Sequence, residues 1–279
     1  MEDNKLFDAL MLLLPILAFF IGIAAALVGI GGGVFMAPIL ILIYGFLPKQ
    51  ASGTSITAII FTSISSTIIY KKQGRIDYVV GLILAATTIP GAFLGSYATS
   101  IVPSQTLGMV FAVFLLFVAL RMLIGLNQEK PRKENKGSRG WSRKIIDRDG
   151  IEFLYQTDIR LTPFFGFSAG FFSGLLGIGG GSLLVPAMHL GMGVPMHITV
   201  ATSMFIMIFT SISGSITHFY LGNVSFEHAL LLALGVIFGA RIGAKTAKKV
   251  SARGLRKTFG IILILISLRM FLKFVGLVP

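Results

Sequence analysis

Apolar stretches alternate with short polar loops along the whole chain, and they form two series of five. A membrane-spanning helix needs about 20 apolar residues. The third, fourth and fifth stretches of each series reach that length, whereas the second stretches are too short. We therefore expect the first two stretches of each series to form a hairpin of helical pieces that turns near mid-membrane, either re-entrant or fully spanning. The stretches are residues 7–28, 34–47, 51–70, 77–98 and 104–126, then 161–176, 182–194, 198–220, 226–244 and 255–275.

A glycine cluster interrupts the apolar pattern once in each series, between the first and second stretches. The clusters are Gly29-Ile30-Gly31-Gly32-Gly33 and Gly177-Ile178-Gly179-Gly180-Gly181. Glycine costs about 1 kcal/mol relative to alanine inside a helix, so three adjacent glycines break it. A broken helix in lipid exposes unpaired backbone groups, which is tolerated only where protein covers them or where they line a wet cavity. The two breaks are therefore candidate sites.

The two series are copies of one another at an offset of 148 residues, the spacing between Gly29 and Gly177. One register holds over most of this length, which indicates an internal repeat. The matching positions include Pro15 and Pro163, Thr54-Ser55 and Thr202-Ser203, Phe61–Ser65 and Phe209–Ser213, Gly91 and Gly239, and Arg121-Met122 and Arg269-Met270.

Loop charge indicates that the two copies cross the membrane in opposite directions. Lys71, Lys72 and Arg75 follow the third stretch of the first copy, whereas the equivalent loop at 221–228 has no Lys or Arg. Basic loops face the cytoplasm. We therefore predict an all-α polytopic membrane protein of two inverted-topology repeats, with both termini outside. Its parts are a first repeat (1–126), a basic cytoplasmic connector (127–160) and a second, inverted repeat (161–279).

Composition supports a membrane protein and excludes several other classes. The chain is 54% hydrophobic and 13% charged, with a mean hydropathy of +0.87, whereas soluble domains carry about 25% charged residues. The net charge of +13 is gathered in a few loops, which favours membrane orientation over nucleic-acid binding. The chain has no cysteine, so disulfides and thiolate metal sites are excluded. No His or carboxylate spacing suggests a metal site, and we expect no cofactor and no enzymatic activity.

The connector at 127–160 allows two interpretations. It carries nine Lys and Arg residues together with Pro131, Gly137 and Gly140. The first interpretation is a tether whose charge only sets topology. The second is a contact with lipid headgroups, or a regulatory contact.

The glycine clusters also suggest the chemistry of the site. A helix that restarts after them has unpaired N–H groups in its first turn, and these attract anions. The opposing interpretation is tight helix packing, because glycines also gather at helix contacts in membranes. The candidate anion-binding residues are Gly31, Gly32 and Gly33 in the first copy, and Gly179, Gly180 and Gly181 in the second.

Hydroxyl and cationic side chains extend this candidate site. Hydroxyls can replace part of an anion's hydration shell, or they can bond neighbouring helices. Arg241 faces an internal path or reaches the basic interface. The candidate binding hydroxyls are Thr54, Ser55, Thr202 and Ser203, and the candidate gating or path residues are Thr62, Thr210, Arg121, Arg241 and Arg269.

The doubled Gly-Ile-Gly-Gly-Gly…Pro segments, each followed by a Thr-Ser pair, resemble the TauE/SafE sulfite exporter family. The Arg-Met pair that ends each copy fits this resemblance, which covers residues 10–273. It implies a secondary transporter in a prokaryotic inner membrane that exports sulfite or a small organosulfonate such as sulfoacetate. The expected partners are that anion and the lipid bilayer, with no nucleic acid and with a homo-oligomer left open. A passive anion channel or an importer with the same site is the alternative, and a membrane enzyme or scaffold is a third class.

Overall fold

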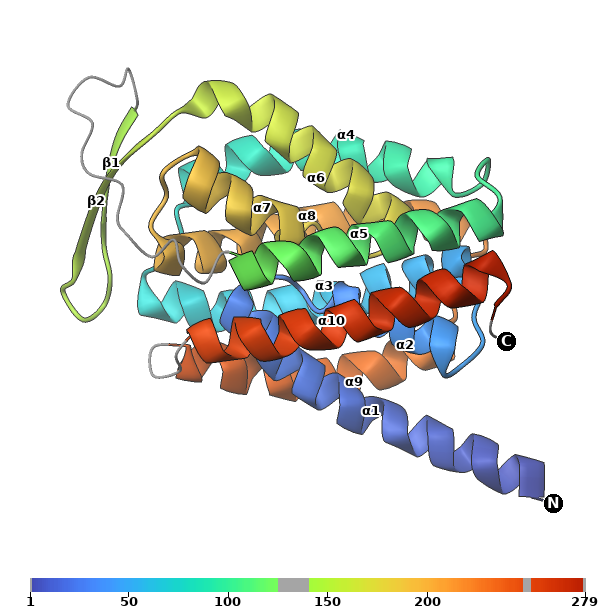
Figure 1. Cartoon of the computed structure of the whole chain (residues 1–279). Coiled ribbons are helices and arrows are strands. Elements are labelled where there is room, and N and C mark those ends of the chain that lie inside the picture. The colour runs from blue at the N-terminus through green and yellow to red at the C-terminus, as the bar shows by residue number, and fades with distance from the viewer. Residues whose placement is uncertain (1, 125–140, 248–251, 278–279) are drawn as a thin grey trace.

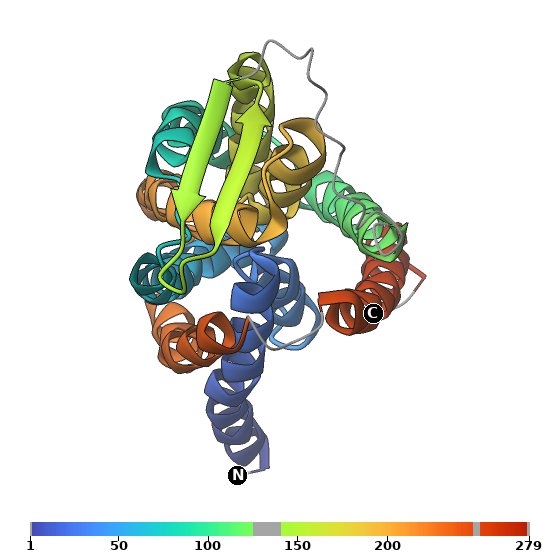
Figure 2. The same ribbon diagram turned by 90° about the vertical axis from the view of Figure 1, so that its left-hand side faces the viewer.

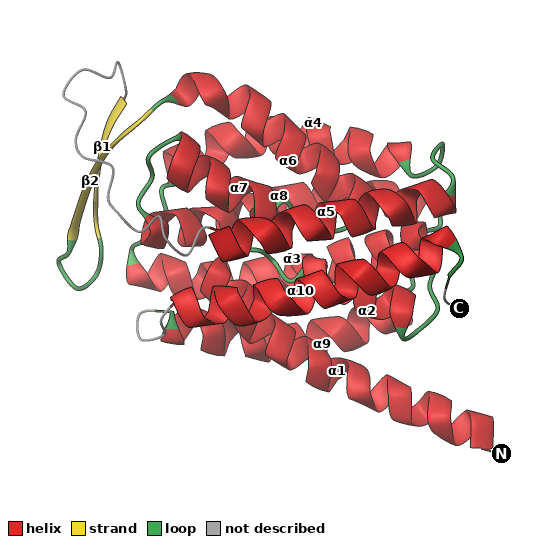
Figure 3. Cartoon of the chain, viewed as in Figure 1, coloured by secondary structure: helices red, strands yellow, loops and turns green. Residues whose placement is uncertain are grey.

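The computed structural model describes residues 2–124, 141–247 and 252–277, which form a helical bundle with a β-hairpin at one end (Figures 1 and 3). Part of the predicted connector, residues 127–140, lies outside the described residues. The helices of the first half are α1 (Glu2–Val28), α2 (Gly33–Leu42), α3 (Pro48–Gln73), α4 (Tyr78–Ala98) and α5 (Ser104–Ile124). Those of the second half are α6 (Thr162–Leu176), α7 (Gly181–Pro186), α8 (Met196–Tyr220), α9 (Phe226–Thr246) and α10 (Ala252–Val275). A π-helical turn, Ala187–Gly191, follows α7.

The helices match the ten predicted apolar stretches. Among the described residues, seven helices are long and apolar enough to cross a membrane, and α2 and α6 are shorter apolar helices. At 10 residues, α2 is about 15 Å long, or half the apolar thickness of a bilayer. The chain is therefore a mostly helical, multi-pass membrane protein, as the pattern predicts.

The part of the connector that the structure describes is more ordered than a tether. Strand β1 (Trp141–Ile146) pairs antiparallel with β2 (Glu152–Thr157). The two strands form a hairpin that lies across one end of the bundle (Figure 2). The purely helical prediction is thus wrong for these residues, and the tether interpretation misses a folded element.

The main helix pairs join one half of the chain to the other. Helix α1 packs along α9 and α6 packs along α4, while α3 and α8 pack together and α5 pairs with α10. Glycines allow the backbones to approach closely. A Cβ atom at Gly91 would lie 2.4 Å from the carbonyl oxygen of Phe167, and one at Gly239 would lie 2.0 Å from that of Phe19. These two contacts are related by the 148-residue offset, so the two halves pack reciprocally.

The hairpin end of the bundle gathers the ends of α3 and α9. The amide of Arg148, in the hairpin turn, donates to the carbonyl of Gln73 at 3.0 Å. Gln73 Nε2 donates to the carbonyl of Ala244 at 2.9 Å. At the opposite end of the bundle, where α1 begins and α10 ends (Figure 1), Lys273 Nζ donates to the carbonyl of Ile41 at 3.3 Å.

We predict that Gly91→Ala and Gly239→Ala each lower stability by about 1–3 kcal/mol, because the added methyl group meets a backbone carbonyl in a packed helix contact. The matched control is Gly254→Ala in α10, where a Cβ atom would meet open space and the change gains up to about 1 kcal/mol of helix propensity. The midpoint of thermal unfolding in detergent compares the stability of the three variants. Equal midpoints for Gly239→Ala and Gly254→Ala would contradict the reciprocal packing.

Candidate functional site

The two glycine turns meet in the interior of the bundle and leave no room for side chains between them. A Cβ atom at Gly33 would lie 2.4 Å from the carbonyl oxygen of Gly177. Its counterpart, a Cβ atom at Gly181, would lie 2.4 Å from the carbonyl oxygen of Gly29. Each turn therefore packs its backbone directly on the backbone of the other.

Backbone conformation explains why these positions are glycine. Gly31 and Gly32 have φ of 78° and 90°, and Gly179 and Gly180 have φ of 81° and 79°. Left-handed values like these are strained for residues with a Cβ atom. The helices restart at Gly33 and Gly181, as the sequence predicts.

Each restarted helix has its first amides before the first helical hydrogen bond. The amide of Met36 donates to the carbonyl of Gly32 at 3.0 Å, and that of Leu184 donates to the carbonyl of Gly180 at 2.9 Å. The amides of Phe35 and Leu183 donate to the same two carbonyls, at 3.0 Å and 3.1 Å. The N–H groups before them, at Gly33 and Val34 and at Gly181 and Ser182, lie at the positive end of the helix dipole. This arrangement is chemically suited to an anion.

Two apolar side chains close the turns in this conformation. Ile59 lies near the middle of α3, and its counterpart Met207 lies near the middle of α8. A Cβ atom at Gly31 would lie 2.7 Å from Met207 Sδ, and one at Gly179 would lie 3.0 Å from Ile59 Cγ2. Both side chains are fully buried. In this conformation the glycine turns are buried, and these two side chains pack over them.

The predicted serines bond across the two halves. Ser55 Oγ donates to the carbonyl of Gly177 at 2.8 Å, and Ser203 Oγ donates to the carbonyl of Gly29 at 2.9 Å. Each serine thus satisfies a carbonyl of the opposite glycine turn. In this conformation both hydroxyls bond neighbouring helices. This is the alternative to substrate binding that the sequence also allowed.

The predicted threonines hold the starts of two other helices. Thr202 Oγ1 accepts from the amide of Asp77 at 3.0 Å, before α4. Thr54 Oγ1 accepts from the amide of Ser225 at 3.0 Å, before α9. Asp77 and Ser225 are counterparts, so this pair of bonds is reciprocal as well.

The other hydroxyls proposed for an anion path are buried and bonded. Thr210 Oγ1 donates to Thr88 Oγ1 at 2.7 Å. Thr62 Oγ1 donates to the carbonyl of Ala58 at 3.4 Å, within its own helix.

Two serines that the sequence analysis did not single out flank the second turn. Ser173 and Ser182 are buried, and their hydroxyls have no hydrogen-bond partner in the part of the chain that the structure describes. A Cβ atom at Gly180 would lie 3.5 Å from Ser173 Cβ, and Ser182 directly follows Gly181 in the first turn of α7. Their counterparts are Ala25 and Val34, so a search for repeated polar residues passes over them.

The candidate arginines do not gather at the glycine turns. Arg121 lies near the end of α5 and Arg269 near the end of α10. The two helices run antiparallel, because Gln105 Nε2 at the start of α5 donates to the carbonyl of Phe274, so the arginines lie toward opposite ends of the bundle. Arg241 is exposed on the outer surface of α9. None of the three contributes a cation to the turns.

An apolar groove of about 580 Å³ lies away from the turns, between α4 and α8. Phe93, Tyr97 and Tyr220 line it, and all three are exposed on the outer surface. It faces the region that lipid occupies in a membrane protein, and we do not assign it to the anion path. Among the described residues, no group of three His, Asp or Glu side chains could hold a metal ion.

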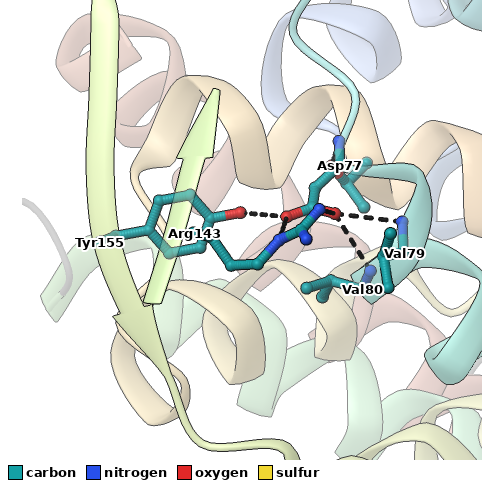
Figure 4. A network of polar contacts seen from close by, with 6 residues as sticks. Asp77, Val79, Val80, Arg143 and Tyr155 are labelled. Carbon is teal, nitrogen blue, oxygen red and sulfur yellow. Dashed lines mark hydrogen bonds and ion pairs between the residues drawn. The ribbon is translucent and has the colours of Figure 1, made fainter. Parts of the chain in front are cut away.

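A polar cluster around Asp77 is a second feature that the sequence analysis missed (Figure 4). Asp77 caps α4, and Oδ1 accepts from the amides of Val79 and Val80 at 3.1 Å each. Arg143 of β1 donates to both carboxylate oxygens, from Nε at 3.0 Å and from its terminal nitrogen at 2.8 Å. The hydroxyl of Tyr155, from β2, donates to Oδ2.

Electrostatics keep this buried carboxyl ionised. Burial raises the pKa of Asp77, but hydrogen bonds from Arg143, Tyr155 and the Val80 amide together lower the pKa below its usual 3.8. Burial and the bond to Asp77 raise the pKa of Tyr155, so its hydroxyl stays protonated and donates. The hairpin is therefore bound to α4 by a charge-assisted network at neutral pH.

Comparison with known proteins identifies relatives over nearly the whole chain. A family model described as sulfite exporter TauE/SafE matches residues 14–270. The chain is 35% identical to the probable membrane transporter protein YunE of Bacillus subtilis, over 91% of this chain and 94% of that protein. It is 30% identical to the probable membrane transporter protein MJ0441 of Methanocaldococcus jannaschii, over 96% and 99% respectively. No solved structure matches the chain.

We predict that Ser55→Ala and Ser203→Ala each destabilise the protein by about 1–3 kcal/mol, because each leaves a buried glycine carbonyl without its donor. Ser100→Ala is the control, since that exposed hydroxyl bonds only to the carbonyl of Tyr97 in its own turn, and its effect should stay within about 0.5 kcal/mol. The thermal unfolding midpoints of the three variants in detergent test this prediction. Equal unfolding midpoints for all three variants would show that the serine–carbonyl bonds between the halves do not stabilise the protein.

Proposed function

We propose a function from one premise: the chain belongs to the sulfite exporter TauE/SafE family. It is a multi-pass membrane transporter, not an enzyme. Within that class we propose a secondary transporter that exports sulfite or a related small organosulfur anion, such as sulfoacetate. The alternative is a passive anion channel, or an importer that uses the same site.

The proposed architecture is a pair of inverted repeats in a prokaryotic cell membrane. Three pairs of contacts support it, because they recur at the same 148-residue offset: the glycine turns, the serine–carbonyl bonds and the threonine–amide bonds. The basic loops support an orientation with the hairpin end in the cytoplasm and both termini outside. Helices α1 with α2, and α6 with α7, are then hairpins that turn near mid-membrane.

The observation that carries the proposal is the meeting of two helix starts at the centre of the bundle. The amides at the starts of α2 and α7 are suited to bind the oxygen atoms of an anion. The hydroxyls of Ser173 and Ser182, which have no partner among the described residues, add two donors at the second turn. None of the candidate arginines reaches the turns, and an anion held by dipoles and hydroxyls is released more readily than one held by a full positive charge.

If the buried turns bind the anion, transport requires a moving part. Ile59 and Met207 cover Gly31 and Gly179, so an anion reaches the amides only when these side chains move aside. Apolar side chains exclude water and ions from a narrow passage. We propose that this pair forms the central gate of the transport path.

We predict that Gly32→Val and Gly180→Val reduce sulfite flux in proteoliposomes about tenfold or more, a cost of about 1.4 kcal/mol or more, because a branched side chain at either turn blocks the amides. Gly45→Val is the matched control. It has the same left-handed strain, with φ of 69°, but nothing lies near its Cβ position. Full flux in both turn variants would exclude the turns as the site.

The same vesicles separate a coupled transporter from a channel. Concentrative sulfite movement that depends on an imposed ion gradient excludes the channel, whereas movement that only follows the sulfite gradient supports it. Sulfate, thiosulfate, sulfoacetate and chloride in the same assay define the substrate.

We predict that Met207→Ala increases passive anion leak, because it removes half of the proposed central gate. Met204→Ala is the control, since Met204 is equally buried, one turn away on α8. Both changes cost about 2–5 kcal/mol of stability as large-to-small core substitutions, so differences in leak cannot come from stability alone. Equal leak from the two variants would refute the gate.

A further inference from the structure

The β1–β2 hairpin directs two polar side chains at one carboxylate. Arg143 and Tyr155 are directly opposite one another in the strand register, so they lie on the same face of the ribbon. Figure 4 shows both reaching the carboxylate of Asp77 from the two strands. The bidentate geometry of Arg143 fixes the position of the hairpin over the start of α4.

A second ion pair holds the tip of the hairpin. Arg75, just after α3, donates to Asp147 Oδ2 from Nε at 3.2 Å and from its terminal nitrogen at 3.0 Å. Both residues are buried. Asp147 Oδ1 also accepts from the amides of Asp149 and Ile151, which shapes the turn. The hairpin is thus bound to the bundle at its middle and at its tip.

The hairpin covers an apolar cluster that leads to the second glycine turn. Tyr155 is buried in this cluster, and Ile145 and Phe153 pack against it from the same two strands. The bundle residues of the cluster come from α4, α6, α7, the π-helical turn and α8, among them Val80, Leu184, Met188 and Ile198. Because α7 begins at Gly181, the hairpin closes the end of the bundle toward which α7 extends (Figure 2).

The repeat offers a comparison for this closure, because the position equivalent to Asp77 lies before α9. The counterpart of Asp77 is Ser225, and the amide of each donates to a threonine hydroxyl of the other half, Thr202 and Thr54 respectively. Ser225 bonds through its hydroxyl to His228 Nδ1 at 2.9 Å, within its own helix. The position before α9 therefore holds a neutral residue. The carboxylate before α4 is matched instead to the hairpin's arginine and tyrosine.

Asp77 connects three elements that must separate if this end opens. Its side chain binds the hairpin, its capping bonds hold α4, and its amide binds Thr202 of α8. A buried carboxylate that loses its arginine partner is strongly unfavourable unless water enters. Closed and open arrangements are therefore two discrete states rather than a continuum.

We propose that the β1–β2 hairpin is a latch that closes this end of the transport path, and that Arg143 and Tyr155 leave Asp77 when the end opens. The proposal rests on the proposed transport function. It makes the hairpin a gating element of the transporter and Asp77 its receptor on the bundle.

Cysteine accessibility tests the latch, because the natural chain has no cysteine. A reporter cysteine at Met188 lies in the buried cluster beneath the hairpin. Arg143→Gln and Tyr155→Phe should each increase the rate of maleimide labelling of this reporter in membrane vesicles about tenfold. The control Lys144→Gln breaks an exposed ion pair to Glu152 on the same hairpin and should leave the rate unchanged.

A second reporter separates opening from general unfolding. A cysteine at Ile41 is fully buried in α2, close to the opposite end of the bundle, and its labelling should stay slow in every variant. Unchanged labelling at Met188 in Arg143→Gln and Tyr155→Phe overturns the latch. A parallel rise at Met188 and Ile41 also overturns it, because the hairpin would then be only a structural brace.

Flux measurements connect the latch to transport. In the cysteine-free background, Arg143→Gln should change sulfite efflux while Lys144→Gln keeps the natural rate, and natural efflux in Arg143→Gln overturns the gating role. Labelling needs no substrate, so the two proposals fail separately. If the protein moves no sulfur anion but the labelling changes as expected, the proposed substrate is wrong. The proposal that the hairpin closes this end of the bundle is then unaffected.

Discussion

The contact on which the fold depends is that between the backbones of two glycine turns inside an apolar bundle. A bilayer provides no water to satisfy an interrupted helix, so every broken backbone bond must find a partner within the protein. Here the carbonyls of Gly29 and Gly177 accept from Ser203 and Ser55, each from the opposite half. At each break, a serine of the other half therefore supplies the donor for one glycine carbonyl. These bonds join the two halves, as does the packing of α1 on α9 and of α6 on α4.

The sequence predicts much of this arrangement because the strongest signals are local. Apolar runs of about 20 residues and glycine clusters mark helices and their ends without reference to the rest of the chain. The helix starts at Gly33 and Gly181 follow from that logic. The partners of the hydroxyls cannot be predicted from local signals, because Ser55 bonds a residue 122 positions away and Ser203 bonds one 174 positions away. Periodicity places such side chains on a face, but only the tertiary fold decides which carbonyl that face meets.

The residues that sequence reasoning missed are those that break the repeat. Ser173 and Ser182 stand opposite Ala25 and Val34, and Asp77 stands opposite Ser225. A search for doubled features discards them, although the structure places two beside the second glycine turn and one beneath the hairpin. The hairpin was missed for a different reason. Its strands are six residues each within a basic connector, and strands so short are specified by what they pack against.

These departures from symmetry bear on how a transporter with the proposed inverted repeats can favour one direction. Two equivalent halves around a central site give two end states of similar free energy, because opening one end breaks the same contacts as opening the other. Bonds that exist at one end only remove that equality. The Asp77 network and the Arg75–Asp147 pair occur where the hairpin covers the bundle, so they add to the stability of states in which that end is closed. A ligand can reverse such a bias only by the difference in its affinity for the two states. In the proposed mechanism the paired glycine turns are the site common to both end states, and the proposed latch determines how often that site faces each side.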